Sequence, residues 1–344
     1  MVFTYTTHRK GTNMLRITLN ENDGGQRLDK FLQKALRGLP LSLMYKYIRK
    51  KRVKVNGKRA KENQILCAGD CIELYIPDEF SRNEGGTAEL DRICTVPRIL
   101  YEDENIIICD KPPGVLSHTG DKNEQGAGSI PERETLIFIL QAYLYRRGEY
   151  NPKEETSFAP ALCNRIDRNT GGIVIAAKNA AALREMNRLI REGLLDKRYL
   201  CAVHGRPTPA QAVLEGYLFK NAKTKTVSVT SSPVPGAKRI VTGYRTLSYN
   251  KEYDLSLLEI HLKTGRTHQI RAHMAWAGHP LLGEGKYGQN KQDRALGYAH
   301  QALYAYRIAF TVPDGPLAYL NGQTFSVDSE NIRFLKLFSW REQP

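Results

Sequence analysis

The stretch that decides the fold of this chain reads N-R-I-D-R-N-T-G-G-I-V-I-A-A-K and spans residues 164–178. Its apolar, largely β-branched run at residues 173–177 predicts a short buried strand. The Gly-Gly pair at residues 171–172 predicts a turn in which the backbone can adopt unusual angles and approach a large neighbour. A strand that follows such a turn would hold the residues in front of it, Asp167 among them, in a fixed position.

Asp167 is the only carboxylate between Glu155 and Glu185, and Arg165 and Arg168 lie close to it in sequence. Nearby cations favour the ionised form of a carboxylate, so we expect Asp167 to carry a negative charge at neutral pH. Taken alone, an Asp before a glycine turn is more often a surface residue that caps local N–H groups. The wider sequence favours a functional role instead.

This stretch resembles the active-site motif of the RluA-type pseudouridine synthases, whose usual form is H-R-L-D-x-x-T-S-G-L-L-L-x-A-K. Two further stretches resemble motifs of that family in the same order, K-R-Y-L-C-A at residues 197–202 and G-R-T-H-Q-I-R-A-H at residues 265–273. Together the matches cover most of residues 97–313. There are two departures: Asn164 stands where the family usually has His, and Gly172 is interpreted as standing where it usually has Ser.

The composition of the 344 residues suggests two domains and a polyanionic partner. Hydrophobic residues make up 41% of the chain, enough for a sizeable core, and the formal net charge is +15. A basic surface attracts phosphate backbones, and an anionic membrane would attract it in the same way. The sequence has no apolar run of 18 residues and no signal peptide, so we expect a soluble, cytoplasmic protein without a membrane partner.

The cysteines and histidines do not predict a metal site. Of the six cysteines only Cys67 and Cys71 lie close together, and no second pair completes a zinc pattern. In a cytosolic chain we expect reduced cysteines in the core. His268, His273 and His279 are spaced by five and six residues, which does not place them on one helical face. We therefore expect no metal and no cofactor, and a protein that acts as a monomer.

Residues 25–76 predict two short helices followed by a small sheet built on a hairpin. Apolar residues at helical spacing mark the first helix at residues 28–36, and Ser42 is a candidate N-cap for the second. An Asn-Gly pair at residues 56–57 predicts a tight hairpin turn. This order resembles the S4 RNA-binding domain, and residues 48–57 are similar to its most typical segment.

Between Lys46 and Lys61 the sequence has nine basic residues and no acidic one. An ordinary exposed face mixes the two signs, so a single sign over this length predicts a nucleic-acid surface. Clustered cations gain affinity for RNA because each can release a counterion from the phosphate backbone. The residues expected to bind RNA are Arg27, Lys46, Arg49, Lys50, Lys51, Arg52, Lys54 and Lys58.

From residue 98 onwards, many strands with few interleaved helices predict an α+β fold with a mixed, largely antiparallel β-sheet. Residues 81–97 are polar and contain a Gly-Gly pair, which is typical of a linker. We therefore expect an S4-like RNA-binding domain at residues 1–80 and a pseudouridine synthase catalytic domain at residues 98–344. Late in this second domain, Thr267 is a candidate cap for a helix that Gly278 would end.

The resemblance implies that specific uridines in RNA are isomerised to pseudouridine. Among relatives with an S4 domain the common substrate is large-subunit, 23S-type ribosomal RNA, so we expect this partner here. The reaction breaks the bond between uracil N1 and the ribose and rejoins the ring through C5, without redox change or metal. It needs one ionised carboxylate near C1′, and Asp167 fits this need either as a nucleophile or as a base.

The resemblance also implies roles for the other motif residues. Arg271 would form an ion pair with Asp167 and orient its carboxylate. The ring of Tyr199 would lie against the target uracil, with the hydroxyl available for proton transfer, and Arg165 would fill the space of the flipped-out base. The residues expected to contact the RNA substrate or to support the loop are Arg266, His268 and Gln269.

Two other functions stay open at this point. A non-catalytic RNA-binding or ribosome-assembly factor is one, because a decayed active site would begin with changes such as those at Asn164 and Gly172. A nucleoside hydrolase or glycosylase is the other, and it would release free uracil. Glycoside hydrolysis usually needs a second carboxyl group, for which Glu259 and Glu284 are the candidates.

Overall fold

The computed structural model describes residues 4–7, 13–36, 38–77, 80, 87–118, 135–221 and 226–340. The chain forms two compact units. The first consists of Met1–Val96, Ile137–Ala161 and Ala177–Arg184, and the second of Pro97–Leu136, Leu162–Ala176 and Glu185–Pro344. The domain boundaries predicted from the sequence stay predictions, and residues 81–86 of the predicted linker lie outside the described residues.

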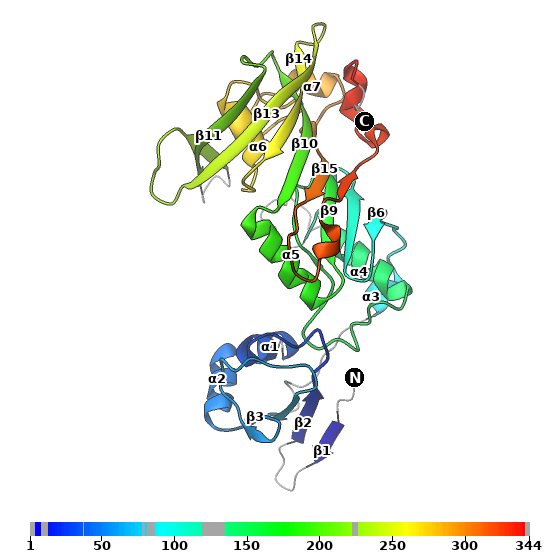
Figure 1. The fold of residues 1–344 in the computed structure, drawn as a ribbon, viewed down its shortest axis with the longest axis vertical. Coiled ribbons are helices and arrows are strands. Elements are labelled where there is room, and N and C mark those ends of the chain that lie inside the picture. Colours follow the sequence, from blue (N-terminus) through cyan, green and yellow to red (C-terminus); the bar gives the residue numbers. More distant parts are fainter. Residues whose placement is uncertain are drawn as a thin grey trace. The chain divides into compact units, whose positions relative to one another are not determined.

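The N-terminal part of the first unit folds into a small antiparallel sheet with two helices (Figure 1). The sheet has the strand order β1-β2-β5-β3-β4. The two helices and the strands β3, β4 and β5 are the arrangement that the sequence predicted for residues 25–76, whereas β1 and β2 precede that range. The elements are β1 (Thr4–Thr7), β2 (Asn13–Thr18), α1 (Leu28–Ala35), α2 (Leu41–Arg49), β3 (Val53–Val55), β4 (Lys58–Arg59) and β5 (Cys71–Tyr75).

The apolar face of α1 explains how this part holds together. Leu28, Phe31 and Leu32 are buried and share one core with Ile72 and Leu74 of β5. Burial of each such side chain contributes roughly 1.5–3 kcal/mol relative to exposure. The same core therefore fixes the two helices against the sheet that follows them in sequence.

The start of α2 differs from the prediction that Ser42 caps it. The N-cap is Pro40, whose carbonyl oxygen accepts the N–H groups of Leu43 at 3.0 Å and Met44 at 2.9 Å. Proline suits this position because its φ is fixed and it has no N–H that would lack a partner. The prediction for Ser42 was therefore wrong.

The remaining elements supply the larger sheet and the helices around it. None of the helices within the described residues is long and apolar enough to cross a membrane. In chain order the elements are α3 (Ala88–Asp91), β6 (Arg98–Glu102), β7 (Ile106–Lys111), α4 (Leu136–Arg146), β8 (Ala161–Leu162), β9 (Gly171–Ala177), α5 (Ala180–Glu192), β10 (Leu195–His204), β11 (Gln211–Lys220), β12 (Val227–Thr230), β13 (Lys238–Asn250), β14 (Leu255–Leu262), α6 (Gln269–Trp276), α7 (Lys291–Ala295), β15 (Leu303–Phe310), η3 (Ala318–Leu320), β16 (Thr324–Ser326), η4 (Ser329–Asn331) and η5 (Arg333–Leu337).

The larger sheet is mixed and mostly antiparallel, which confirms the predicted α+β class. In the part of the chain that is described it has 11 strands, with the order β12-β11-β13-β14-β10-β15-β9-β7-β6 and with β16 beside β15 and β8 beside β9. Strand β9 pairs parallel with β15, whereas β10, β13 and β14 pair antiparallel. Figure 1 shows these three long strands side by side.

Two inner strands, β7 and β9, are buried along their whole length. Burial on both faces explains why their apolar residues do not alternate with polar ones. Strand β9 is the one predicted after Asp167, and it lies between β15 and β7. The Asp167 loop is therefore anchored to an inner strand of the sheet.

Helix α6 packs against β12 and β13 and carries the third motif. It begins after His268, which has a left-handed backbone with φ of 54° and makes no side-chain cap. The prediction that Thr267 caps this helix was therefore wrong, whereas Gly278 follows its end with φ of 85°. The left-handed turn buries the His268 ring.

Candidate active site

Asp167 lies in the loop between β8 and β9 and lines a cavity of about 880 Å³. Further walls of the cavity include the start of β10 and residues 261–271, which hold the second and third motifs. All the residues predicted for catalysis and substrate binding line this cavity, although their roles stay predictions. They are Asp167, Tyr199, Arg271, Arg165, Arg266, His268 and Gln269.

A close backbone approach fixes the turn behind Asp167. Gly172 has φ of 112°, and a Cβ at this position would lie 2.1 Å from the carbonyl oxygen of Ala305 on the parallel strand β15. No other residue fits, because the added atom would overlap backbone that cannot move aside. Thr170 adds a turn bond to the Asp167 carbonyl at 3.1 Å.

The predicted Ser-to-Gly departure was assigned to the wrong glycine. With Thr170 and the apolar run kept in register, the family's Ser falls on Gly171 and its Gly on Gly172. A Cβ on Gly171 would lie 2.3 Å from the Tyr304 ring. The Tyr304 hydroxyl donates to Asp110 at 2.7 Å, which holds the ring in place. The ring therefore fills the space that a Ser side chain would need.

Asn164, the other departure from the family motif, has a clear supporting role. Its Oδ1 accepts the N–H of Ile175 at 2.8 Å, and its Nδ2 donates to the carbonyl of Ile173 at 3.4 Å. One side chain thus bonds to two backbone groups of β9. These bonds tie the start of the Asp167 loop to the strand that follows the loop.

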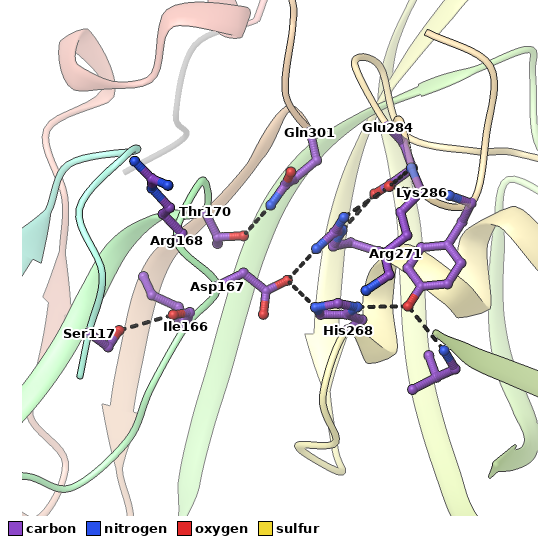
Figure 2. Close-up of polar contacts among 12 residues, drawn as sticks. Ser117, Ile166, Asp167, Arg168, Thr170, His268, Arg271, Glu284, Lys286 and Gln301 are labelled. Carbon is purple, nitrogen blue, oxygen red and sulfur yellow. Dashed lines mark hydrogen bonds and ion pairs between the residues drawn. The ribbon is translucent and has the colours of Figure 1, made fainter. Parts of the chain in front are cut away.

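Arg271 links Asp167 to a buried carboxylate, as Figure 2 shows. Its Nη1 donates to Asp167 Oδ2 at 2.8 Å. Its Nε and Nη2 donate to the two oxygens of Glu284 at 2.6 and 2.9 Å, which is a bidentate pair. The Tyr287 ring lies 5.6 Å from the guanidinium carbon. The ion pair expected between Arg271 and Asp167 is therefore present, and Glu284 fixes its orientation.

Electrostatics keep this chain of groups ionised. Burial alone would lower the pKa of Arg271, but Glu284 and Asp167 raise it above its ordinary value. Burial alone would raise the pKa of Glu284, but Arg271 and the backbone N–H groups of Lys286 and Tyr287 lower it. Arg271 therefore remains a cation beside Asp167.

The two oxygens of Asp167 have different surroundings. Oδ2 accepts from Arg271 and lies 3.8 Å from His268 Nε2. For Oδ1, no hydrogen-bond partner is present within the described ranges, and the residue lines the cavity. Oδ1 is therefore the oxygen that is available to a substrate.

His268 connects Asp167 to Tyr287. Its Nδ1 lies 2.7 Å from the Tyr287 hydroxyl, which in turn accepts the N–H of Val227 at 3.3 Å. Burial raises the pKa of Tyr287 to about 12, so its hydroxyl keeps its proton at neutral pH. The other ring nitrogen of His268, Nε2, faces Asp167 Oδ2 at 3.8 Å.

Gln269 is bound on both ends of its amide by protein groups. Its Oε1 accepts from Thr264 at 2.9 Å and from the Arg266 N–H at 3.1 Å. Its Nε2 donates to Val241 and Thr242 at 3.1 and 3.0 Å. Through these contacts Gln269 can position the loop that presents the exposed Arg266 to the cavity. Its amide then has few hydrogen-bonding sites left for RNA.

Tyr199 and Arg165 lie in the cavity wall with different exposure. Tyr199, on β10, is 7% exposed, and burial together with the charge of Asp167 raises the pKa of its hydroxyl. Its hydroxyl therefore keeps its proton at neutral pH. Arg165 is exposed and precedes Asp167 by two residues. This exposed position places its guanidinium where a substrate can reach it.

Lys111 is a supporting residue whose role the sequence did not reveal. It is fully buried at the end of β7, and its ammonium donates to three carbonyl oxygens, those of Pro112 at 3.0 Å, Val115 at 2.8 Å and Arg168 at 2.9 Å. Burial lowers its pKa to about 7, while the three acceptors favour the ammonium form. Ser117 adds a bond to the Ile166 carbonyl at 3.0 Å.

We expect Lys111→Met to loosen the Asp167 loop. The variant keeps the length of the side chain but leaves three buried carbonyls without a donor, which should lower the free energy of unfolding by about 1–3 kcal/mol. We also expect kcat to fall with little change in KM, because the Arg168 carbonyl next to Asp167 loses its tether. Denaturant unfolding and steady-state kinetics measure both. Lys336→Met, at an exposed position, is the control, and an unchanged kcat for Lys111→Met would contradict the prediction.

The two candidates for a second catalytic carboxylate both already have protein partners. Glu284 is enclosed by Arg271 and backbone N–H groups. Glu259 is buried and accepts from the Tyr306 hydroxyl and from Arg245 and Arg307, both at 3.3 Å. Neither lines the cavity. The expectation that one of them serves a glycosidase mechanism is therefore not supported by the geometry.

Most of the cations expected to bind RNA are exposed in the small N-terminal sheet and helices. Lys54 is partly buried with its ammonium 5.3 Å from the Tyr75 ring, and Arg52 lies 5.4 Å from the Tyr47 ring. Arg27 differs, because its Nη2 pairs with the buried Asp29 at 2.8 Å. The exposed cations are Arg27, Lys46, Arg49, Lys50, Lys51, Arg52 and Lys58. Within the described ranges, no group of three or more His, Cys, Asp or Glu side chains could hold a metal ion.

Comparisons with known proteins agree with this arrangement. The family model of RNA pseudouridylate synthase matches residues 105–276, and that of the S4 domain matches residues 26–72. An uncharacterized RNA pseudouridine synthase of Mycoplasma pneumoniae is 34% identical over 84% of this chain and 86% of its own length. The ribosomal large subunit pseudouridine synthase C of Haemophilus influenzae is 31% identical over 90% of this chain and 88% of its own.

The fold points in the same direction. The solved structure of human RNA pseudouridylate synthase domain containing 4 matches 69% of this chain and 93% of that one, with a TM-score of 0.51 and 19% identity, which shows a shared fold. The non-catalytic alternative rested on two departures, and both now have structural explanations at Asn164 and Gly171. The chain therefore belongs to the RNA pseudouridine synthase family and is an enzyme of that family with an S4 RNA-binding domain, which isomerises uridine in RNA.

Proposed function

We propose that this enzyme converts specific uridines of large-subunit ribosomal RNA to pseudouridine, with Asp167 acting on a flipped-out base. The observation that carries the proposal is the Glu284–Arg271–Asp167 chain, which leaves one carboxylate oxygen available to the cavity. The choice of RNA is supported by relatives from Haemophilus influenzae and Vibrio cholerae, which are ribosomal large subunit pseudouridine synthases C by name.

The proposed chemistry uses Asp167 Oδ1 near the target C1′. In one route the oxygen bonds to C1′ as the N1 bond breaks, and C5 of the rotated uracil later displaces it from C1′. In the other the carboxylate takes a proton from the ribose as the N1 bond breaks, and it returns that proton when C5 bonds to C1′. In both routes the uracil stays in the cavity, the C5 proton leaves after the new bond has formed, and N1 gains a proton. Arg271 supports either route by holding Oδ2 and keeping the carboxylate charged.

The cavity suits a nucleotide that has left its stack. Its volume of about 880 Å³ falls within the roughly 300–1,000 Å³ of small-molecule sites. Extrusion of a base costs a few kcal/mol, and Arg165 at the rim would offset part of that cost by filling the vacated space. Tyr199 would hold the uracil with its ring, because its raised pKa favours a contact through the protonated phenol over removal of a proton.

The direct test is a map of pseudouridines in ribosomal RNA from cells with and without the gene for this protein. We expect at least one large-subunit position to lose its pseudouridine in the deletion strain and to regain it when the wild-type gene is restored. An Asp167→Asn gene should fail to restore it. A deletion strain whose large-subunit pseudouridines are all retained, with the loss in another RNA instead, would contradict the proposed substrate.

The S4 domain should provide much of the docking affinity through its cations. We expect a variant with Lys46, Arg49 and Lys50 all changed to Gln to bind RNA more weakly and with a flatter salt dependence. Each released counterion contributes about 0.7–0.9 to the slope of log K against log salt, so the slope should fall by about two. Turnover at saturating RNA should hardly change. Equilibrium binding at several salt concentrations measures the slope.

A matched control removes the same charge elsewhere. Three exposed lysines of the second unit can be changed to Gln together, Lys220, Lys238 and Lys336. This control should reduce the slope less than the S4 variant does. Equal slopes for the two variants, or an unchanged slope for the S4 variant, would show that the basic segment is not the docking surface.

A further inference from the structure

Lys197 has an unusual position in the cavity wall. It lies on β10 two residues before Tyr199, so both side chains leave the same face of the strand, about 7 Å apart. Both residues line the cavity. The Lys197 Nζ lies 3.8 Å from the point that a Cβ on Gly265 would occupy, which places it beside the loop of the third motif. Its cross-strand neighbour on β15 is the apolar Ile308.

The Lys197 ammonium has no protein partner within the described part of the chain. Among the residues that the structure describes, no carboxylate and no hydrogen-bond acceptor is in contact with it, and burial lowers its pKa without an opposing acid. Asp196, its neighbour in sequence, is bound by Arg198 at 2.8 Å and lies 3.1 Å from His261. A partly buried cation without a partner is costly, and a ligand of opposite charge would remove that cost.

The charge of the cavity and the place of Lys197 indicate which ligand this is. Seven Lys and Arg side chains line the cavity against two Asp side chains, so the cavity favours an anion. The negative charges of an RNA substrate lie on its phosphodiesters, because uracil itself is neutral. Lys197 lies in the cavity wall beside the Gly265 loop, where its ammonium can meet a phosphodiester that adjoins the base.

We propose that Lys197 binds a phosphodiester adjacent to the target uridine and so sets the position of the nucleotide backbone in the cavity. This site rests on the proposed function, since it adds a substrate contact to the same reaction. The tyrosine two residues further along β10 would meet the base while Lys197 meets the backbone. Two side chains on one face of β10 would thereby contact the base and the backbone of the same nucleotide.

The test uses the full-length protein and an RNA fragment that contains a mapped target uridine. The fragment is made with normal phosphates, or with one neutral methylphosphonate on the 5′ or the 3′ side of that uridine. For the wild type, one of the two methylphosphonates should raise KM and Kd by about tenfold or more, because a charge-assisted hydrogen bond is lost. Lys197→Met should show a similar loss on normal RNA, an unchanged kcat and no further response to the methylphosphonate.

Two comparison variants sharpen the result. Lys197→Arg keeps the charge and should recover most of the affinity. Lys238→Met removes an exposed lysine that does not line the cavity, and it should respond to the methylphosphonate as the wild type does. Lys197→Met should also unfold at the same temperature as the wild type or higher, because it removes a cation without a protein partner.

Three outcomes would overturn the proposal. They are equal methylphosphonate effects in the wild type and Lys197→Met, a fall in kcat at unchanged KM, and a clear loss of thermal stability in Lys197→Met. A wild type that binds this RNA but does not isomerise it would contradict the proposed function instead. In that case the Kd values still test the role of Lys197. They show whether the methylphosphonate weakens binding in the wild type and fails to do so in Lys197→Met.

Discussion

Asp167→Asn should abolish pseudouridine formation and leave the affinity for RNA nearly unchanged. The substitution keeps the shape of the side chain and removes its charge. It breaks the 2.8 Å ion pair with Arg271 and replaces the anionic oxygen that is available to the cavity. RNA affinity rests mainly on the basic surfaces, which the substitution leaves intact. Isomerisation of bound RNA in single-turnover assays should therefore fall below detection, while equilibrium binding gives a Kd close to that of the wild type.

Asp196 offers a matched control for this experiment. It is the other carboxylate that lines the cavity, and it is bound by Arg198. Asp196→Asn also removes one negative charge from the cavity, but it should keep most of the activity. Substantial pseudouridine formation by Asp167→Asn would rule out the proposed mechanism, whatever the control shows.

Arg271→Ala should have the second largest effect, on stability and on chemistry together. Its guanidinium is the bidentate partner of Glu284, whose side chain is 0% exposed. Removal of one partner of a buried ion pair costs about 3–5 kcal/mol, because the other charge stays buried without compensation. The same substitution removes the bond that orients Asp167. We therefore expect a large fall in the free energy of unfolding and, in the protein that stays folded, a large fall in kcat.

The double variant Arg271→Ala/Glu284→Gln separates the two effects. It removes the uncompensated charge of Glu284, so most of the lost stability should return. The orientation of Asp167 does not return, so kcat should stay low. Denaturant unfolding and single-turnover assays on the single and double variants provide the comparison. A double variant that regains activity along with stability would show that Arg271 acts only on the fold.

Arg165→Ala provides a contrast, because Arg165 is assigned to the base that leaves its stack. Its loss should matter most when the target uridine starts in a structured loop. Mutations in the RNA that relax this loop leave the target uridine already unstacked. The enzyme then no longer has to provide the unstacking free energy, which is on the order of a few kcal/mol. The relaxed RNA should therefore restore Arg165→Ala substantially and Arg271→Ala hardly at all. If both variants respond alike, Arg165 is another electrostatic support for Asp167.

The sequence predicted the parts of this site whose signals are local. The apolar run of β9, the glycine turn and the Asp between two arginines occupy one stretch of sequence, and each has a period or composition that indicates its structure. Ser42 and Thr267 were wrongly predicted as helix caps because a residue's preference for the cap position is not enough to identify the cap. Both are common cap residues, but Pro40 and the left-handed His268 already start those helices, and cap preference alone does not reveal which of two neighbours takes the position.

The supporting contacts could not be predicted, because they join residues without a shared local pattern. Glu284 lies 13 residues after Arg271, beyond the end of its helix. Lys111 follows five buried residues of β7, where a lysine normally marks the end of burial, and yet it is 0% exposed. Its burial depends on three carbonyl oxygens, those of Pro112 and Val115 just after it and that of Arg168 in the Asp167 loop, which is far away in sequence. The partners become visible once the sheet brings the two stretches together.

The fit of the Tyr304 ring over Gly171 limits the order in which mutations can accumulate here during evolution. A serine at position 171 is blocked while the ring occupies that space. A smaller residue at position 304 leaves a gap and removes the hydroxyl that Asp110 accepts from. Either change made first passes through a less stable protein, so the two positions are energetically coupled. We expect relatives with serine at this point of the motif to have a smaller residue opposite it. We also expect the two positions to have changed together during evolution.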